Sequence, residues 1–558
     1  MTEVLAPAMG PKDKTVTMTG WRLLPHGIIF LSSACLMIVE LVAGRLIARD
    51  LGSSLYTWTS IIGVILAGMS LGNFLGGRMA DWWKPRGFLG WLFLAGSVTC
   101  VLTLLVNHVL SESDWVSGKL DEWDLGLPAR IVLYTVTLFL PPAIVLGTIS
   151  PAAAKLALER SRRVGGTIGS VYAWGAIGSI LGTFVAGFWL IATLGARGVV
   201  LAVALTLCAI GLSLGPRRIV HALWALIVCE LLWLSQTAWD PAYQLACHFG
   251  VQEGEQGTEW LDEPRYVRPA FARDSNYQFV RVTHFDDYET GRRLYQLELD
   301  NLIHGYVDLD DPSHLEYEYE EVYAALARAF AQERQRVTAL FLGGGSYTFP
   351  RWILAEWPGS TCDVAEIDPV VVEANHKALG LPEDTPIRTF VNDARVTVNR
   401  LPAEKQYDLI LGDAFSDLSV PWHLTTLEFH QKLRGCLKPD GVLLANIIDD
   451  VEAGGAFLGA YVETVRRVFK HVYVFCMAPF GVEAGQETFV VAATDSADTA
   501  LHEQLSSLTP DHGEEFPGSL LTPEELETLR RKCSGRILTD DNAPVENLLA
   551  PVFRVKEP

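Results

Sequence analysis

The chain has 558 residues, more than one domain usually holds, and its net charge of −21 accompanies a mean hydropathy of +0.22. A content of 49% hydrophobic residues excludes a disordered chain. The charge is uneven: residues 1–238 hold 17 Lys and Arg against 12 Asp and Glu, a net of +5, and the remainder holds 27 against 53, a net of −26. Because the second part of the chain is strongly acidic, it would repel nucleic acid, which is therefore not expected as a partner.

The nine cysteines are scattered along the chain. The sequence contains no CxxC pair and no Cys/His cluster with metal-ligand spacing. We therefore expect neither a disulfide framework nor a metal site.

The first part of the chain is a succession of apolar segments. Residues 1–25 are a polar tail without the apolar core of a cleavable signal peptide. Most of the segments that follow reach the roughly 20 residues needed to span a bilayer. They predict a multi-span transmembrane domain over 26–238, built from runs at about 26–48, 55–77, 88–110, 130–157, 166–193, 198–215 and 218–238.

The charges between these runs predict an orientation. Basic residues gather in the second, fourth and sixth loops, at 78–86, 155–163 and 217–218, which indicates a cytoplasmic N-terminus. Seven full spans would then place the acidic part outside the cell. The 218–238 run carries His221 and Glu230 and could instead lie in the interface or pack on the protein. We expect a multi-pass inner-membrane protein with a cytoplasmic C-terminal domain, although the loop charges with seven spans argue otherwise.

Two small-residue patterns lie in the membrane part. Residues 72–81, followed by Lys84 and Arg86, resemble a short cytoplasmic loop motif of major facilitator transporters. The fifth run carries regularly spaced glycines, for which close helix packing is favoured over a substrate path. These are Gly169, Gly175, Gly178, Gly182 and Gly187.

The acidic part predicts an α/β fold. Residues 239–310 are expected to be a linker and a small β domain, with strands over 265–308 and a turn at 288–291. Residues 311–558 alternate helical patterns with buried strands, which is typical of a doubly wound, Rossmann-like sheet. The segment 487–494 is a candidate antiparallel strand at an edge of the sheet. The other strands are expected at 337–342, 361–367, 407–412, 441–447 and 472–476.

Polar residues follow successive strands of this predicted sheet. The first strand ends in Gly343-Gly-Gly345, and the second ends at Glu366, where a carboxylate accepts hydrogen bonds from ribose hydroxyls. A third strand ends at residues 392–394 and a fourth at 413–417. Because the carboxyl ends of parallel strands form the ligand crevice of such sheets, the set predicts a nucleoside site. A GKS/T phosphate loop is absent, which argues against an ATPase.

These motifs, in this order, resemble the spermidine synthase family of polyamine aminopropyltransferases, and in particular its membrane-fused members. The resemblance runs from about residue 265 to 550. Beyond the strand ends, it includes segments similar to the family's S-x-Y-Q, LDGxxQ and Tyr-His/Gln-Glu motifs and to the tail of fused members. These segments are 274–278, 299–304, 319–321 and 538–545.

The resemblance implies a reaction and its participants. An aminopropyl group moves from decarboxylated S-adenosylmethionine to a diamine such as putrescine, and methylthioadenosine is released. It implies a multi-span membrane domain joined to a methyltransferase-like Rossmann sheet. No cofactor is expected to be bound permanently, because decarboxylated S-adenosylmethionine is a co-substrate. The expected partners are the diamine, the lipid bilayer and a second copy of the chain, the last by resemblance only.

The resemblance also carries roles over to single residues. Asp413 matches the catalytic aspartate. The positions that match donor-binding residues are Gln278, Gly343, Gly345, Ser346, Glu366, Asp393 and Ala394. The positions expected to face the diamine are His304, Tyr319, Glu320 and Asp417.

Three departures from the family pattern leave alternatives open. Ser346 stands where the family has an aspartate that contacts the donor's amine, His304 replaces a glutamine, and Glu320 replaces a histidine or glutamine. Glu320 could restore the negative charge that position 346 lacks. The alternatives are an enzyme that uses ordinary S-adenosylmethionine, such as a methyltransferase on the same fold, and a transporter or sensor whose C-terminal domain binds a ligand.

Overall fold

A computed structural model describes residues 15–550, apart from a set of short segments and one linker. The exceptions are 53–54, 113–126, 160, 162, 215–217, 238–268, 288–289, 301, 332–333, 403, 415–419, 453, 478–486 and 507–517. The chain divides into two compact units, one drawn mainly from residues before 238 and the other mainly from residues after it. Each unit is described separately.

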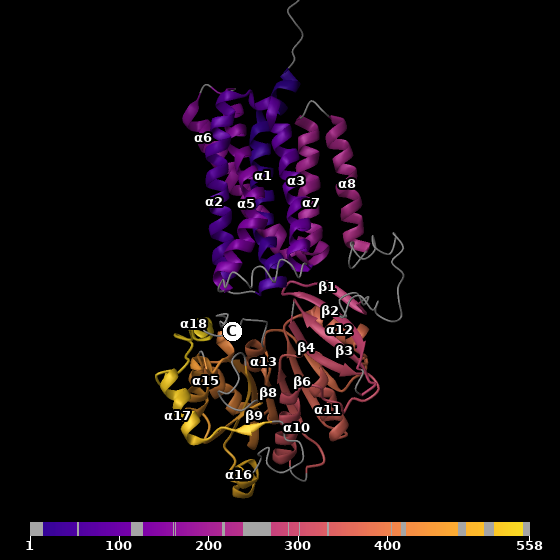
Figure 1. The fold of residues 1–558 in the computed structure, drawn as a ribbon, viewed down its shortest axis with the longest axis vertical. Helices are drawn as coiled ribbons and strands as arrows, with labels where there is room; N and C mark the ends of the chain where they lie inside the picture. The colour runs from indigo at the N-terminus through magenta and orange to yellow at the C-terminus, as the bar shows by residue number, and fades with distance from the viewer. Residues whose placement is uncertain are drawn as a thin grey trace, which may run out of the picture. The chain divides into compact units, whose positions relative to one another are not determined.

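The first unit is a bundle of long helices (Figure 1). A π-helical turn at Ala186–Leu190 joins two of them without a loop. The helices are α1 (Thr15–Leu51), α2 (Leu55–Trp82), α3 (Pro85–Glu112), α5 (Leu127–Leu158), α6 (Val164–Val185), α7 (Ile191–Leu214) and α8 (Arg218–Thr237).

Within the described residues, five helical stretches are long and apolar enough to cross a membrane, judged by length and composition. They are Pro25–Arg49, Leu55–Trp82, Phe88–Leu110, Ala129–Leu158 and Val164–Leu214. The predicted runs 166–193 and 198–215 are counted together as one 51-residue stretch, although the non-helical backbone of Gly195 divides that stretch into two helices. The run at 218–238 forms α8, which is outside the five.

Helix α8 packs against other helices of its unit. The side chain of His221 is fully buried, and its Nε2 lies 3.0 Å from the carbonyl oxygen of Gly90 in α3. Trp224 Nε1 donates a hydrogen bond of 2.9 Å to Ser97 Oγ, which in turn donates to the carbonyl of Ala204 in α7. These buried hydrogen bonds attach α8 to α3 and α7.

Glycines bring pairs of helices into backbone contact. A Cβ added at Gly178 of α6 would lie 2.2 Å from the carbonyl oxygen of Phe30 in α1, and one at Gly182 would lie 2.5 Å from that of Ala34. The predicted packing role thus applies to these two glycines. It does not apply to Gly169 or Gly187, where an added Cβ would meet nothing within 4 Å.

The second unit begins with a small antiparallel sheet in the order β1-β2-β3-β4. This sheet is the predicted small β domain. Its inward side chains pack against helix α12 (Pro369–Ala378), with which they form one buried cluster. The strands are β1 (Phe271–Asp274), β2 (Phe279–Asp286), β3 (Arg293–Leu299) and β4 (Leu302–Asp308).

The larger sheet has eight strands in the order β12-β10-β11-β9-β8-β5-β6-β7. Strands β7, β6, β5, β8 and β9 are mutually parallel. The inner strands β5, β6 and β8 are buried on both faces, as is typical of parallel strands, whereas the edge strand β7 is partly exposed. The strands are β5 (Thr338–Leu342), β6 (Thr361–Glu366), β7 (Ile387–Val391), β8 (Tyr407–Gly412), β9 (Leu437–Asp449), β10 (His471–Cys476), β11 (Glu487–Thr494) and β12 (Ser519–Leu520).

Strand β11 is antiparallel to both of its neighbours, β9 and β10. The antiparallel direction expected for 487–494 is therefore confirmed. The position differs from the expected edge, because β11 is inserted between β9 and β10. The expected α/β fold with a preceding small β domain is confirmed, as a mixed rather than a fully parallel sheet.

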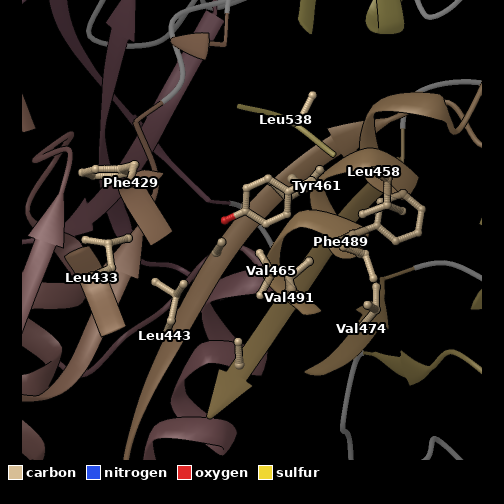
Figure 2. Close-up of a cluster of buried hydrophobic side chains, with 14 of the residues drawn as sticks. Phe429, Leu433, Leu443, Leu458, Tyr461, Val465, Val474, Phe489, Val491 and Leu538 are labelled. Atoms are coloured by element: carbon tan, nitrogen blue, oxygen red, sulfur yellow. The ribbon is translucent and has the colours of Figure 1, made fainter. Parts of the chain in front are cut away.

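Helices cover both faces of the large sheet. The connecting helices are α10 (Glu318–Ala331), α11 (Thr348–Glu356), α12 (Pro369–Ala378), α13 (Ala394–Arg400), η3 (Trp422–Leu424), α14 (Leu427–Cys436), α15 (Ala456–Arg466), α16 (Thr499–Ser506), α17 (Pro523–Lys532) and α18 (Val545–Leu549). Helices α10, α11 and α16 share one buried cluster, and α13, α14, α15, α17 and α18 share the other. Figure 2 shows part of the second cluster, where Phe429, Tyr461 and Phe489 gather with Leu538 of the C-terminal tail.

Candidate active site

The turn after β5 brings two strand ends together. Gly343 and Gly345 have φ angles of 104° and 50°, which favour glycine. A Cβ at Gly343 would lie 2.2 Å from the carbonyl oxygen of Asp413, at the end of β8. Glycine is thus required here both by backbone conformation and by the close approach of the two strand ends.

Glu366, at the end of β6, is bound by this same turn. Its Oε2 accepts a 2.8 Å hydrogen bond from the amide of Gly344, and its Oε1 accepts one of 2.8 Å from the amide of Asp368. Burial raises the pKa of Glu366, and the backbone hydrogen bonds oppose that shift. A carboxylate offers about four acceptor positions, and the backbone of Asp368, Gly344 and Gly345 occupies only part of them, so Glu366 is held in place and can still accept from a ligand hydroxyl.

Asp393, after β7, has both carboxylate oxygens engaged. As the N-cap of α13, its Oδ1 accepts from the amide of Val396 at 2.9 Å. Its Oδ2 lies 2.8 Å from Nε2 of His423, in the short helix η3. Ala394 is the first residue of α13 and is buried. The contact with His423 was not predicted, because thirty positions separate the two residues and no motif links them.

The C-terminal tail fastens the segment that carries His423. Arg395 Nη1 donates to the carbonyl of His423 at 2.9 Å and to Asp540 Oδ1 at 2.7 Å, and Nη2 donates to Asp540 Oδ2. Thr426 Oγ1 donates to Asp540 Oδ1 at 2.7 Å, and the amide of Leu427 donates to the carbonyl of Leu538 at 2.8 Å. Residues 538–540 therefore hold 422–427 beside Asp393.

Asp413 lies at the end of β8 among neutral hydrogen-bond donors. The hydroxyl of Tyr319, in α10, donates to Oδ2 at 3.0 Å, and Asn446 Nδ2, in β9, is 3.3 Å from Oδ1. Burial raises the pKa of Asp413, and both hydrogen bonds oppose the shift. Asn446 was also missed, although a single amide within the apolar strand 442–448 is a usable signal.

Glu320 follows Tyr319 in α10 and is 5% exposed. Its Oε2 has no hydrogen-bond partner within the described residues. Burial, followed by the negative charge of Asp413, raises the pKa of Glu320 to about 8. The expected neighbours Asp413, Tyr319 and Glu320 are thus brought together, with two carboxylates in one buried region.

Tyrosine rings line this region one after another. The ring of Tyr317 lies 5.1 Å from that of Tyr306 and 5.4 Å from that of Tyr319, measured between centroids. Tyr319 in turn meets Tyr323 edge-on at 5.6 Å. Aromatic faces beside carboxylates are a favourable surface for an organic cation.

Ser346 is turned toward the small sheet. Its hydroxyl is 2.6 Å from that of Thr348, which donates to the carbonyl of Tyr306. A Cβ at Gly305 of β4 would lie 2.0 Å from Ser346 Oγ, so the two residues are in close contact. Ser346 is 4% exposed and carries no charge into the site.

The remaining predicted site residues are His304, Gln278 and Asp417. His304 is buried at Nε2 without a partner in the described part of the chain, and burial lowers its pKa to about 4, so the ring is neutral at pH 7. Gln278 is half-buried, and its backbone N–H donates to Ser275 Oγ at 3.0 Å. Asp417 lies outside the described residues.

An apolar pocket adjoins Asp413 on the α14 side of the sheet. Its wall combines strand ends with the segment that follows β8, and it includes the amide of Asn446 and the ring of Tyr461. The other lining residues are Leu342, Gly412, Ala414, Val420, Pro421, Leu424, Thr425, Leu433, Leu443, Ala445 and Ile447.

The strand order, the inserted antiparallel strand and the polar strand ends define the class: a methyltransferase-like α/β domain preceded by a small β domain. A scan against protein-family models gives no match. The chain is 29% identical over 223 residues to a polyamine aminopropyltransferase of Vibrio vulnificus, covering 39% of this chain and 71% of that protein.

Two further similarities are more limited. An N-terminal histidine N-methyltransferase of Emericella nidulans is 35% identical over 141 residues, which cover 25% of this chain and 24% of that protein. The crystal structure of a probable spermidine synthase from Corynebacterium glutamicum is 21% identical with a TM-score of 0.41, covering 49% of this chain and 97% of that one. The C-terminal region is a spermidine synthase-like domain, of the transferase class.

Proposed function

We propose that this chain is a membrane-bound aminopropyltransferase that transfers the aminopropyl group of decarboxylated S-adenosylmethionine to a diamine such as putrescine. The observation that carries the proposal is the pair of buried carboxylates, Asp413 and Glu320, beside the glycine-rich turn. Both substrates are cations, and within the described residues no basic side chain contributes to the electrostatics of either carboxylate. The similarity to the polyamine aminopropyltransferase of Vibrio vulnificus supports the same reaction.

The chemistry assigns Asp413 as the catalytic residue. The neutral amine attacks the carbon beside the sulfonium, the carbon–sulfur bond breaks, and methylthioadenosine leaves with the bonding electron pair. The proton of the new ammonium passes to Asp413, whose raised pKa suits it to accept one. Keeping an amine with a pKa near 10.4 neutral at pH 7 costs roughly 4.6 kcal/mol, so a nearby proton acceptor has a substantial effect.

We assign the donor to the carboxyl ends of strands β5, β6 and β7. The glycines 343 and 345 allow close approach of the backbone, Glu366 accepts from the ribose hydroxyls, and Asp393 with Ala394 meets the adenine edge. Gln278 and Ser346 complete the proposed donor site. The acceptor is assigned to His304, Tyr319, Glu320 and Asp417.

The proposed domain boundaries are a tail at 1–25, a membrane domain at 26–238, a linker and small β domain at 239–310, and the transferase domain at 311–558.

The test is product analysis with the purified full-length chain. Putrescine and decarboxylated S-adenosylmethionine should yield spermidine and methylthioadenosine in equal amounts by mass spectrometry. Asp413→Asn should lower the rate at least about 100-fold, because the proton acceptor is lost. An unchanged rate in this variant would rule out the assigned role of Asp413.

A second candidate is transfer from ordinary S-adenosylmethionine. It is favoured by Ser346, which leaves the glycine-rich turn without a carboxylate, and by the similarity to the Emericella methyltransferase. Calorimetry with both donors separates the two functions: an aminopropyltransferase should bind the decarboxylated donor more tightly, whereas a methyltransferase should not.

The location is also part of the proposal. The five apolar helical stretches support insertion in the inner membrane with several spans, and the substrates place the transferase domain in the cytoplasm. Protease treatment of right-side-out vesicles should leave residues 239–558 intact. Cleavage there from the outside would contradict a cytoplasmic domain.

We further propose that the protein forms a homodimer. The mass of the detergent-solubilised protein would test this proposal.

A further inference from the structure

Glu40 is a carboxylate in the middle of an apolar helical stretch. It belongs to α1, within Pro25–Arg49, which is one of the stretches long and apolar enough to cross a membrane. The midpoint of this stretch is residue 37, only about 4.5 Å from Glu40 along the helix axis. Because the hydrocarbon layer of a bilayer is about 30 Å thick, a spanning α1 places Glu40 deep inside it.

Glu40 has no counter-ion. Among the described residues it takes part in no hydrogen bond or ion pair, and no charged group contributes to its electrostatics. Arg45 is the next basic residue of α1, and the charges that act on Arg45 do not include Glu40. An ionised carboxylate is so unfavourable in an apolar medium that the group is neutralised by a ligand, and ionisable residues inside membrane spans mark functional sites.

Two other polar residues share one face of α1 with Glu40. His26, Ser33 and Glu40 are spaced by seven residues, which is close to two helical turns, or about 10.5 Å. His26 lies beside the end of the apolar stretch, and its Nδ1 is buried without a hydrogen-bond partner in the part of the chain that the structure describes. Ser33 faces α6, because a Cβ added at Gly175 would lie 3.5 Å from its Oγ. The three residues form a polar face that leads from one end of the stretch to its middle.

The part of α6 level with Glu40 continues into a π turn. Gly178 and Gly182 contact carbonyl groups that are four residues apart on α1 as well, so the two helices run side by side in the same direction. Gly182 lies against Ala34, and one further turn along both helices reaches the level of Glu40 and the π turn Ala186–Leu190. Neither α6 nor this turn contains a charged residue. Turns of this kind inside an α-helix are frequent at functional sites.

The chemistry of a single carboxylate narrows the class of ligand. A hard metal cation takes six or more oxygen ligands, and within the described residues no group of three or more His, Cys, Asp or Glu side chains could hold a metal ion. A proton needs only one carboxylate oxygen, and the carboxyl group that results is uncharged. The surroundings of Glu40 therefore fit a proton.

We propose that Glu40 is a proton-binding site of the helical unit, which exchanges its proton with water through the face of α1 that carries Ser33 and His26. In this step a proton from water adds to the Glu40 carboxylate and gives a neutral carboxyl group, and the reverse step returns it. The helical unit thereby has an activity beyond anchoring. The inference rests on the proposed membrane insertion and is independent of the proposed transfer reaction.

Dicyclohexylcarbodiimide tests the protonation of Glu40, because this apolar reagent adds to protonated carboxyl groups in apolar surroundings and leaves a stable N-acylurea. The full-length protein is treated in liposomes at pH 7, and modified residues are identified by mass spectrometry of its peptides. Glu159 is the internal reference, since it is exposed and lies just after α5.

We expect Glu40 to be modified at least about tenfold more than the reference, because a glutamate in water is protonated in only about 0.2% of molecules at pH 7. Glu40→Gln should remove this modification and leave that of Glu159 unchanged. Modification of Glu40 that does not exceed that of Glu159 would overturn the inference, and this measurement needs no variant that folds.

The exchange path is tested by infrared spectroscopy in the same liposomes. The carbonyl band of the Glu40 carboxyl group, identified by its loss in Glu40→Gln, should shift when H₂O is replaced by D₂O. His26→Ala should slow this shift severalfold, whereas Gly27→Ala, whose added Cβ meets nothing within 4 Å, should not. Equal rates in these two variants would overturn the role of His26.

Alkaline carbonate extraction separates a failure of the proposed location from a failure of this inference. Release of the full-length protein from the membrane would overturn both. A protein that stays in the membrane and forms spermidine, with Glu40 unmodified, would overturn this inference alone. Modified Glu40 in a protein that forms no spermidine would support this inference and contradict the proposed reaction.

Discussion

His423 Nε2 lies 2.8 Å from Asp393 Oδ2, and it joins the segment after β8 to the strand end that we assign to the adenine edge. The other oxygen of Asp393 caps α13. Together the two contacts fix the orientation of the carboxylate. The position of His423 is set by the tail, through Arg395 and Asp540.

Replacing His423 with alanine should weaken methylthioadenosine binding by about tenfold, or roughly 1.4 kcal/mol, because Asp393 loses one of its two restraints. Calorimetry measures the change. His423→Gln, which keeps a donor at the same end, should lose less. Equal affinity in all three proteins would mean that His423 does not position Asp393.

Removing the charge of Asp540 should loosen the segment 422–427. Hydrogen bonds to charged groups contribute about 1.5–3 kcal/mol, and Asp540 accepts from Arg395 and Thr426. In Asp540→Asn, hydrogen exchange should accelerate in this segment and the KM for the donor should rise more than kcat falls. The neighbouring Asp541 is exposed, and Asp541→Asn is the matched control. The prediction fails if both variants behave alike.

The affinity for putrescine should rise with pH. The pKa of Glu320 is raised to about 8, so this carboxyl holds a proton over much of the range near pH 7 and must lose it to bind a cation. Binding should therefore strengthen between pH 6 and pH 8.5, and Glu320→Gln should flatten the profile. The titratable groups that face Glu320 are Asp413, Glu316, Tyr317, Tyr319 and Tyr323.

The same raised pKa predicts an effect on stability. The folded state holds the proton of Glu320 more tightly than the unfolded state, whose pKa is near 4.5, so stability from this group falls as the pH rises between those two values. At pH 8, Glu320→Gln should stabilise the ligand-free protein by about 1–3 kcal/mol, because it removes an unpaired buried charge. Denaturant unfolding at pH 5 and pH 8 checks this, and the gain should be smaller at pH 5.

In the helical unit, replacement of either of two glycines with alanine should have clearly different effects on stability. Gly178→Ala should cost about 1–3 kcal/mol, since the added methyl lies 2.2 Å from the carbonyl oxygen of Phe30. Gly169→Ala meets nothing within 4 Å and should be neutral or slightly stabilising, because alanine favours helix by up to about 1 kcal/mol. Thermal unfolding in detergent compares them.

Periodicity and strand-end chemistry were sufficient to predict the α/β fold, because apolar strands such as 338–342 and 407–412 are short, continuous and separated by helical patterns. They were not sufficient to place β11 between β9 and β10, since strand order depends on contacts between distant segments. The two-residue strand β12 is too short to produce a pattern.

The residues of the candidate site also divide into those that the sequence predicts and those that it does not. The place of glycines 343 and 345, Glu366 and Asp413 at the carboxyl ends of strands could be predicted, because each lies at or directly after the end of a predicted strand. His423 and Asn446 could not be assigned in this way, because their roles depend on contacts with Asp393 and Asp413 across the fold. Hydropathy did place the break between the predicted runs 166–193 and 198–215, where Gly195 interrupts the helix, but it gave no sign of the π turn at Ala186–Leu190 inside the first of them.

The insertion of β11 between β9 and β10 has a consequence for biosynthesis. During translation, the chain to Cys476 emerges before Glu487–Thr494, so β9 and β10 each wait with an open edge that only the later strand can fill. At about 5–20 residues per second this interval is short, yet open edges of apolar strands are sites of aggregation. Ribosome stalling or truncation between Cys476 and Thr494 should therefore yield insoluble chains even though the site residues have already been made.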